Sequence, residues 1–154
     1  MRRTFLSLAM APFIALSVFV TPVSAGDQAN KQVGSAETEI VTLTCPSSPN
    51  CVSSFSHGEH RVNPLSYPGK DTATIRKILL AWIKQDPRAH VTYSGPDIIK
   101  AKFKSRFFGF VDDLTLLIQS DGLVDVRSAS RTGYYDFGVN RERIETLRSK
   151  TQNK

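Results

Sequence analysis

The sequence predicts an α+β fold, a two-layer sandwich in which an antiparallel sheet of about four strands carries two helices on one face. Three observations indicate this class. Residues 99–107 alternate between apolar and basic side chains, two further apolar runs flank the turn Ser120-Asp121-Gly122, and two segments show helical periodicity. Short turns between consecutive strands favour antiparallel pairing.

The first helix is expected over residues 71–85. Asp71 or Thr72 can cap its start, and Asp86-Pro87 ends it. Its apolar residues recur at i, i+3, i+4 and i+7, which places them on one core-facing stripe: Ile75, Ile78, Leu79 and Trp82.

The second helix is expected to begin at Val139 or Asn140 and to end at about Lys150. Asn140 is the expected N-cap. Ile144 and Leu147 give this helix a thin apolar stripe. Basic side chains near its end suit the helix dipole.

Strands are expected on both sides of the turn Gly95-Pro96. Residues 89–93 alternate between apolar and polar side chains, and residues 99–107 do so with a regularity that indicates one buried and one wet face. The wet face carries Lys100, Lys102, Lys104 and Arg106. It would present a basic surface to phosphate or carboxylate groups, or it is a solvated face whose lysines discourage edge pairing.

A hairpin is expected from residues 112–119 and 123–131. A three-residue loop with Gly122 in the left-handed region keeps the apolar side chains on one face, whereas a two-residue loop would mix polar and apolar residues on both faces. This register pairs Ile118 with Val124, Leu116 with Val126, Leu114 with Ser128, Asp112 with Ser130 and Thr115 with Arg127.

The N-terminal segment, residues 1–25, is expected to be a signal peptide. Arg2 and Arg3 precede an apolar run over residues 5–20, and Val23-Ser24-Ala25 offers a cleavage site after Ala25. The alternative is an uncleaved anchor helix. Export places the protein in the periplasm or outside the cell.

The rest of the chain is expected to form one domain. Residues 26–44 are polar and small for most of their length and are predicted to be a mostly flexible leader, in which Glu39–Thr44 would add at most a minor strand. Residues 45–150 are predicted to be a single globular domain, and Val52–Leu65 an ordered loop within it.

Cys45 and Cys51 are the only cysteines, and export predicts that they form a structural disulfide across the loop CPSSPNC. A redox pair is the alternative, but the spacing is not C-x-x-C and no helix start follows. His57 and His60 form an H-x-x-H pair with no third ligand placed by spacing. No metal and no cofactor is therefore expected.

The predicted binding site is the arginine-rich turn before the last helix. Arg127, Arg131 and Arg141 are expected to converge beside Asn140 at the first amides of that helix, where guanidinium and N–H groups suit an anion. The alternative is a purely structural network between these arginines and three acids: Asp112, Asp113 and Asp136.

The sequence does not favour an enzymatic function. Ser130 is the candidate nucleophile and Asp112 the candidate acid or base, but no histidine is placed near them and no G-x-S-x-G elbow is present. Asp112 and Asp113 are adjacent in a strand and therefore point to opposite faces, which argues against a shared metal ion.

Three stretches resemble the family called domain of unknown function 1499: CPSSPNCVSS, Asp112-Asp113, and RSASRTGYYDFGVNRERI. The resemblance spans Cys45 to about Leu147. It implies a bacterial envelope or plastid protein and supplies no activity. The shared positions are Cys45, Cys51, Asp112, Asp113, Arg127, Ser128, Ser130, Arg131, Gly133, Asp136, Gly138, Asn140 and Arg141.

Together these features predict an exported, non-enzymatic envelope binding module that recognises an anionic group through the arginine-rich turn. A peripheral membrane contact fits this role, and nucleic acid is not expected, because the net charge of +6 falls to +4 once Arg2 and Arg3 leave with the signal peptide, and such a charge is only mildly basic. The alternatives are a small hydrolase and a structural protein that binds an envelope protein through Phe108 or Phe110. The oligomeric state stays open.

Overall fold

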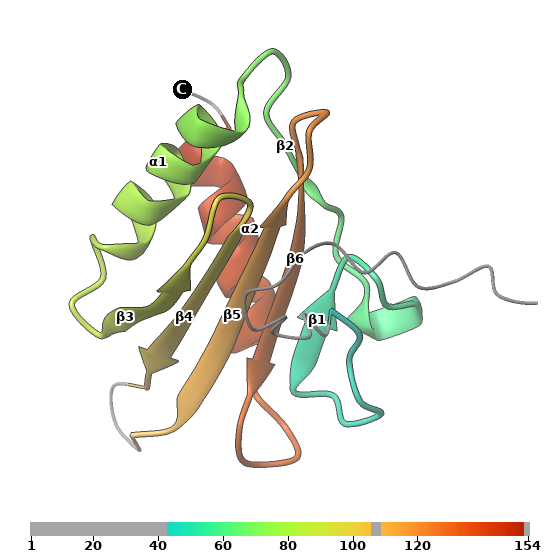
Figure 1. Cartoon of the computed structure of the whole chain (residues 1–154). Coiled ribbons are helices and arrows are strands. Elements are labelled where there is room, and N and C mark those ends of the chain that lie inside the picture. Colours follow the sequence, from blue (N-terminus) through green and yellow to red (C-terminus); the bar gives the residue numbers. More distant parts are fainter. Residues whose placement is uncertain (1–42, 106–108, 153–154) are drawn as a thin grey trace, which may run out of the picture. The chain divides into compact units, whose positions relative to one another are not determined.

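The computed structural model describes residues 43–105 and 109–152. The signal peptide, most of the leader, and the predicted roles of Arg106 and Phe108 lie outside this part of the chain. The elements, coloured along the chain in Figure 1, are β1 (Cys51–Ser53), the short 3-10 helix η1 (Gly58–His60), β2 (Leu65–Ser66), α1 (Thr72–Ile83), β3 (Ala89–Ser94), β4 (Ile98–Lys104), β5 (Val111–Ile118), β6 (Leu123–Ser130) and α2 (Val139–Thr151).

The strands form one antiparallel sheet in the order β1-β6-β5-β4-β3, and β2 also pairs with β6. The predicted α+β class, with an antiparallel sheet and two helices, is confirmed. The prediction of about four strands is wrong, because the sheet of the described residues has six. The additional strands, β1 and β2, lie in and beside the segment that was expected to be a loop. Both pair with β6 and supply hydrogen-bond partners to its backbone N–H and C=O groups on the side away from β5.

The β5–β6 hairpin has the predicted register. Asp112 lies opposite Ser130, and Leu116 opposite Val126. Gly122 has a φ of 85°, and a Cβ atom at this position would lie 2.7 Å from the carbonyl oxygen of Tyr67. Glycine is therefore needed both for the left-handed backbone and for the close approach of the segment that leads into α1.

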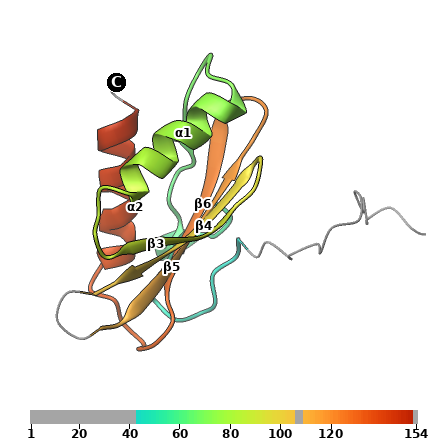
Figure 2. The same ribbon diagram turned by 60° about the vertical axis from the view of Figure 1, so that its left-hand side comes forward.

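The core joins one face of the sheet to both helices, which Figure 2 shows on the same side of the strands. Asp71 caps α1 by accepting the N–H of Thr74 at 2.7 Å. Trp82 is only partly buried and meets Phe103 at 5.9 Å between ring centroids. The fully buried apolar residues of the helices are Ile75, Leu79, Ile83, Ile144 and Leu147.

The segment before β1 carries the predicted disulfide between Cys45 and Cys51, which is confirmed. The Ser53 hydroxyl donates a hydrogen bond to the Leu43 carbonyl and so ties the start of the described chain to β1. Leu43 and Thr44 are not part of a strand. Within the described residues, the helices are too short and too polar to cross a bilayer.

Tyr67 gives the fold a dependence on alkaline pH. Its hydroxyl is buried against Thr151 Oγ1 at 2.6 Å, and this burial raises its pKa above the ordinary value of 10.0. The folded state therefore holds this proton more tightly than the unfolded state does. The resulting stabilisation is fully present below pH 10 and is lost as the pH rises through the folded-state pKa.

We expect the free energy of unfolding to fall more steeply above pH 10 in the wild type than in Tyr67→Phe. Urea unfolding at a series of alkaline pH values measures both slopes, and the other tyrosines and the lysines contribute equally to each protein. Parallel slopes would show that Tyr67 titrates normally in the folded state.

Candidate functional site

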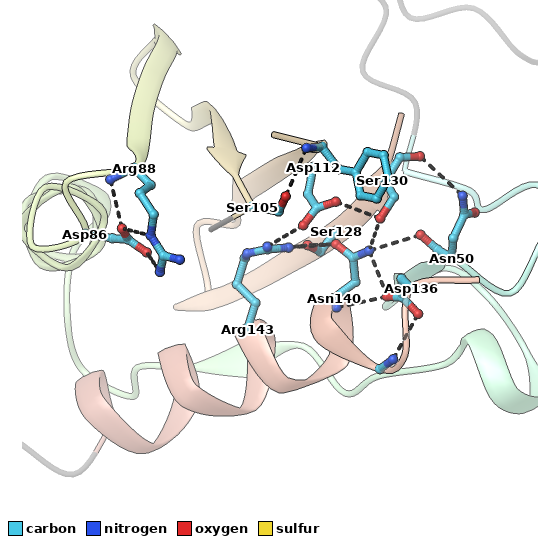
Figure 3. Close-up of polar contacts among 12 residues, drawn as sticks. Asn50, Asp86, Arg88, Ser105, Asp112, Ser128, Ser130, Asp136, Asn140 and Arg143 are labelled. Carbon is cyan, nitrogen blue, oxygen red and sulfur yellow. Dashed lines mark hydrogen bonds and ion pairs between the residues drawn. The ribbon is translucent and has the colours of Figure 1, made fainter. Parts of the chain in front are cut away.

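A buried polar network lies where α2 begins to pack on the sheet (Figure 3). Side chains alternate across a strand, so Asp112, Ser128 and Ser130 share the face of Leu114 and Leu116 that the helices cover. Two residues of α2, Asn140 and Arg143, are three positions apart and therefore meet them from one helix face.

Arg143 is the centre of the network. Its Nη2 donates to Asp112 Oδ2 at 2.6 Å, and the two side chains are only 10% and 8% exposed. Its Nη1 donates to Ser128 Oγ at 2.8 Å and to Asn140 Oδ1 at 2.7 Å. The guanidinium also lies 4.7 Å from the ring centroid of Phe103. A buried charge pair of this kind is tolerated because further hydrogen bonds satisfy both partners.

Asn140 connects three segments that are distant in the sequence. Its Nδ2 lies 3.0 Å from the Asn50 carbonyl, 3.0 Å from Ser130 Oγ and 2.9 Å from Asp136 Oδ2. Its Oδ1 accepts the Ser128 hydroxyl at 2.7 Å. Every buried side-chain nitrogen and oxygen of the described residues has a partner. The amide thus fixes the start of β1, the end of β6 and the turn relative to α2.

The turn between β6 and α2 ends in a cap made by Asp136. Its carboxylate accepts the backbone N–H groups of Gly138 and Asn140, each at 3.0 Å. The N-cap position belongs to Gly138, with a φ of 81°, and not to Asn140, which was the expected cap. Asp136 therefore already supplies negative charge at the helix start, where we expected a ligand's anion.

Two of the predicted arginines lie near Asp113, on the sheet face opposite the core. Arg131 forms a two-pronged ion pair with Asp113, with both distances 2.8 Å, and this pair raises the pKa of Arg131. Arg127 donates from Nε to the Thr44 carbonyl at 3.1 Å. Partial burial lowers the pKa of Arg127, while the charge of Asp113 opposes this shift.

Arg141 has different partners from the other two arginines. From α2 it reaches the carbonyl oxygen of Arg61 at 3.0 Å and that of Glu59. It borders a hollow of about 480 Å³ whose other walls are Pro49, Val52, Glu59, His60, Tyr135, Asp136 and Gly138. The structure thus brings Arg127 and Arg131 to one acid and places Arg141 on a separate element.

The catalytic candidates are engaged within the network. Ser130 donates its hydroxyl to Asp112 Oδ1 at 2.6 Å and accepts from Asn140, while Asp112 is paired with Arg143. The described contacts of Ser130 thus include no histidine that could activate its hydroxyl. His60 Nδ1 bonds the Cys51 carbonyl at 2.9 Å. No group of three or more metal-ligating side chains lies together in the described part of the chain.

Arg143 was not among the residues that sequence reasoning selected. The usable signal was Asp112 itself, because the hairpin register places this carboxylate in an apolar row where it needs a cation. Arg143 stands one residue before the core residue Ile144 and three after Asn140, and its side chain is 10% exposed.

Exposed apolar side chains gather at the same end of the sheet. Tyr134, Tyr135 and Phe137 of the turn are 74%, 62% and 89% exposed. Phe110, before β5, and Val139, at the start of α2, are exposed beside them. The other large apolar side chains exposed in the described residues are Phe55, Tyr93 and Leu123. More than half of this exposed apolar surface therefore lies at one end.

Comparison with known protein families identifies the family of this chain. The family model described as "Protein of unknown function (DUF1499)" matches residues 42–151. No curated protein and no solved structure matches the chain. The matched segment includes the polar network, the turn and both helices.

Proposed function

Because the chain belongs to the DUF1499 family, whose function is unknown, we propose from its own residues that it is a non-enzymatic binding module of the cell envelope. In this proposal the arginine-rich turn before α2 recognises an anionic group, with Arg131 and Arg141 as the contacting side chains. The N-terminal apolar run and the Cys45–Cys51 disulfide support an exported protein.

The observation that carries the proposal is that the buried polar network holds the turn between β6 and α2 in place. A buried ion pair generally stabilises a fold no better than apolar packing of the same volume. Here the pair of Asp112 and Arg143, together with Asn140, fixes the turn between β6 and α2. A network that stabilises the fold no better than apolar packing would, and that positions one surface turn, supports a role for that turn in binding.

The same contacts disfavour the hydrolase alternative. Ser130 and Asp112, its candidate residues, bond each other and Asn140 or Arg143 in the network. In the two-layer arrangement that we propose for the helices and the sheet, Arg127 belongs to the uncovered layer. Arg131, with a side chain 53% exposed, and Arg141, beside its hollow, are then the arginines that a ligand approaching the turn would meet.

The test is co-sedimentation with two anionic probes, purified cell-wall sacculi and vesicles containing phosphatidylglycerol. Protein purified from cells that export it keeps its natural N-terminus. We expect Arg141→Gln to weaken retention about fivefold, the effect of removing one cation from an anionic surface. The matched control is Arg148→Gln, because Arg148 also lies on α2 and also donates to backbone carbonyls, those of Asn63 and Pro64.

Equal losses in the two variants would contradict the proposal, because they would reflect net charge and not the turn. Absence of wild-type retention on both probes would overturn it outright. Retention on either probe that depends on Arg141 supports it.

A further inference from the structure

We propose that the partner of the turn is an anionic lipid bilayer, which the exposed aromatic end of the sheet contacts directly. This inference rests on the proposed function and names its ligand. Two loops reach this end. One joins β4 to β5 and carries Phe110, and the other joins β6 to α2 and carries Tyr134, Tyr135 and Phe137. Figure 1 shows the connection from β6 to α2 below the end of the sheet at which β5 begins.

Phe137 has a conformation that folding alone does not favour. Its φ is 55°, in the left-handed region, where non-glycine residues are uncommon and strained. Its side chain is 89% exposed and adds little to the core. A bulky apolar side chain that is kept exposed by a strained backbone supports a contact with a partner outside the domain. The hydrogen bonds of Asp136 to Gly138 and Asn140 hold the backbone that presents it.

The kinds of side chain suit a bilayer surface. Tyrosine and phenylalanine have large apolar rings, and aromatic side chains collect at the level of the lipid headgroups. The three rings lie in the turn between β6 and α2, and Phe110 directly precedes β5, so all four are at the end of the strands, where they can enter that layer without opening the fold. Tyr135 and Phe137 also meet edge to face at 5.7 Å between centroids, which makes them one apolar unit.

The charge next to this end is complementary to anionic lipid. Alternation places the basic residues of β4 on the sheet face away from the core, together with Arg127 and Asp113. The cations of this face and its end are Lys100, Lys102, Lys104, Arg127 and Arg131. The acids beside them are Asp113, paired with Arg131, and Asp125, which accepts hydrogen bonds from Ser54 and Gln119. Among the described residues of this sheet face, cations therefore outnumber acids, as attraction to lipid phosphates requires, while Asp136 in the aromatic turn is held by the N–H groups of Gly138 and Asn140.

The decisive variant is Phe137→Asn. Asparagine adopts the left-handed region more readily than phenylalanine, so the fold is expected to keep or gain stability. Binding to phosphatidylglycerol vesicles is expected to weaken about tenfold, the order expected when a phenylalanine no longer leaves water. The matched control is Phe55→Asn, which removes an exposed ring of the same type from the turn after β1. It should bind like the wild type.

A second pair of variants tests the charge. Lys104→Gln removes the cation at the end of β4, and Lys77→Gln removes an exposed one from α1. We expect about a fivefold loss for Lys104→Gln and none for Lys77→Gln. Vesicles of phosphatidylcholine alone should retain the protein much less than vesicles containing phosphatidylglycerol.

The outcomes separate this inference from the proposed function. Retention on sacculi without retention on vesicles overturns the lipid inference and leaves the binding module standing. Retention on neither overturns both. Vesicle binding that is unchanged in Phe137→Asn, or reduced equally in Phe55→Asn, overturns the role of the aromatic end even where the protein does bind lipid.

Discussion

Replacing Arg143 with methionine is expected to lower the free energy of unfolding by about 3–5 kcal/mol. The substitution leaves Asp112, with a side chain only 8% exposed, without the guanidinium that neutralises it. It also removes the donor that Ser128 and Asn140 share. Methionine fills much of the space of the arginine stem, so the loss reports the charge and its hydrogen bonds. Urea unfolding at neutral pH measures it.

The control for this variant is Arg131→Met. Arg131 also pairs with an aspartate, at 2.8 Å, but its side chain is 53% exposed and that of Asp113 is 40% exposed. Water screens this pair, and we expect a much smaller loss than in Arg143→Met. If the two substitutions had equal effects, the ion pair of Asp112 and Arg143 would not be energetically buried, and the argument drawn from its burial would fail.

The hairpin could be predicted because its register follows from local chemistry. A strand has a side-chain period of two, so only one pairing put Leu116 and Val126 on the same face, and Gly122 supplied the backbone that this pairing needs. β1 and β2 could not be predicted in the same way. They have three and two residues and pair through their backbones with β6, so they carry no periodicity of their own.

Of the candidate site, only the residues in the β5–β6 hairpin could be predicted from the sequence. The register placed Asp112 opposite Ser130, and the structure joins them at 2.6 Å. The choice between Arg141 and Arg143 depends on how α2 is rotated against the sheet. Only four residues of α2 are buried, so its apolar stripe is too thin to define this rotation from the sequence. The rotation is set by tertiary packing. The alternation of β6 places Arg127 on the face opposite to Ser128 and to the network around Arg143.

Asn140→Asp is the second substitution with a large expected effect, a loss of about 3 kcal/mol or more at pH 7. The change preserves shape but turns a donor into an acceptor. The new oxygen would face the Asn50 carbonyl, Ser130 Oγ and the Asp136 carboxylate, to which the amide now donates. Asn140 is completely buried, so water cannot compensate.

The pH dependence of this loss identifies its cause. Burial beside Asp136 is expected to raise the pKa of the new carboxyl above its unfolded value. A raised folded-state pKa means that the penalty is small below the unfolded pKa of about 3.9 and grows as the pH rises through the folded-state pKa. Unfolding measured in urea from pH 4 to pH 7 should therefore show a widening gap between Asn140→Asp and the wild type.

Asn63→Asp is the matched control, because it makes the same chemical change at an exposed position. Its effect should stay within about 0.5 kcal/mol across that range. A pH-independent loss in Asn140→Asp would mean that the new carboxyl titrates as it does in water, and hence that the amide is less enclosed than its contacts indicate. A difference in unfolding free energy that widens with pH in Asn140→Asp, and not in Asn63→Asp, would show that the turn is held by the Asn140 amide hydrogen bonds and that water cannot replace them. That rigidity is what a loop needs if it is to keep a strained phenylalanine exposed for a partner.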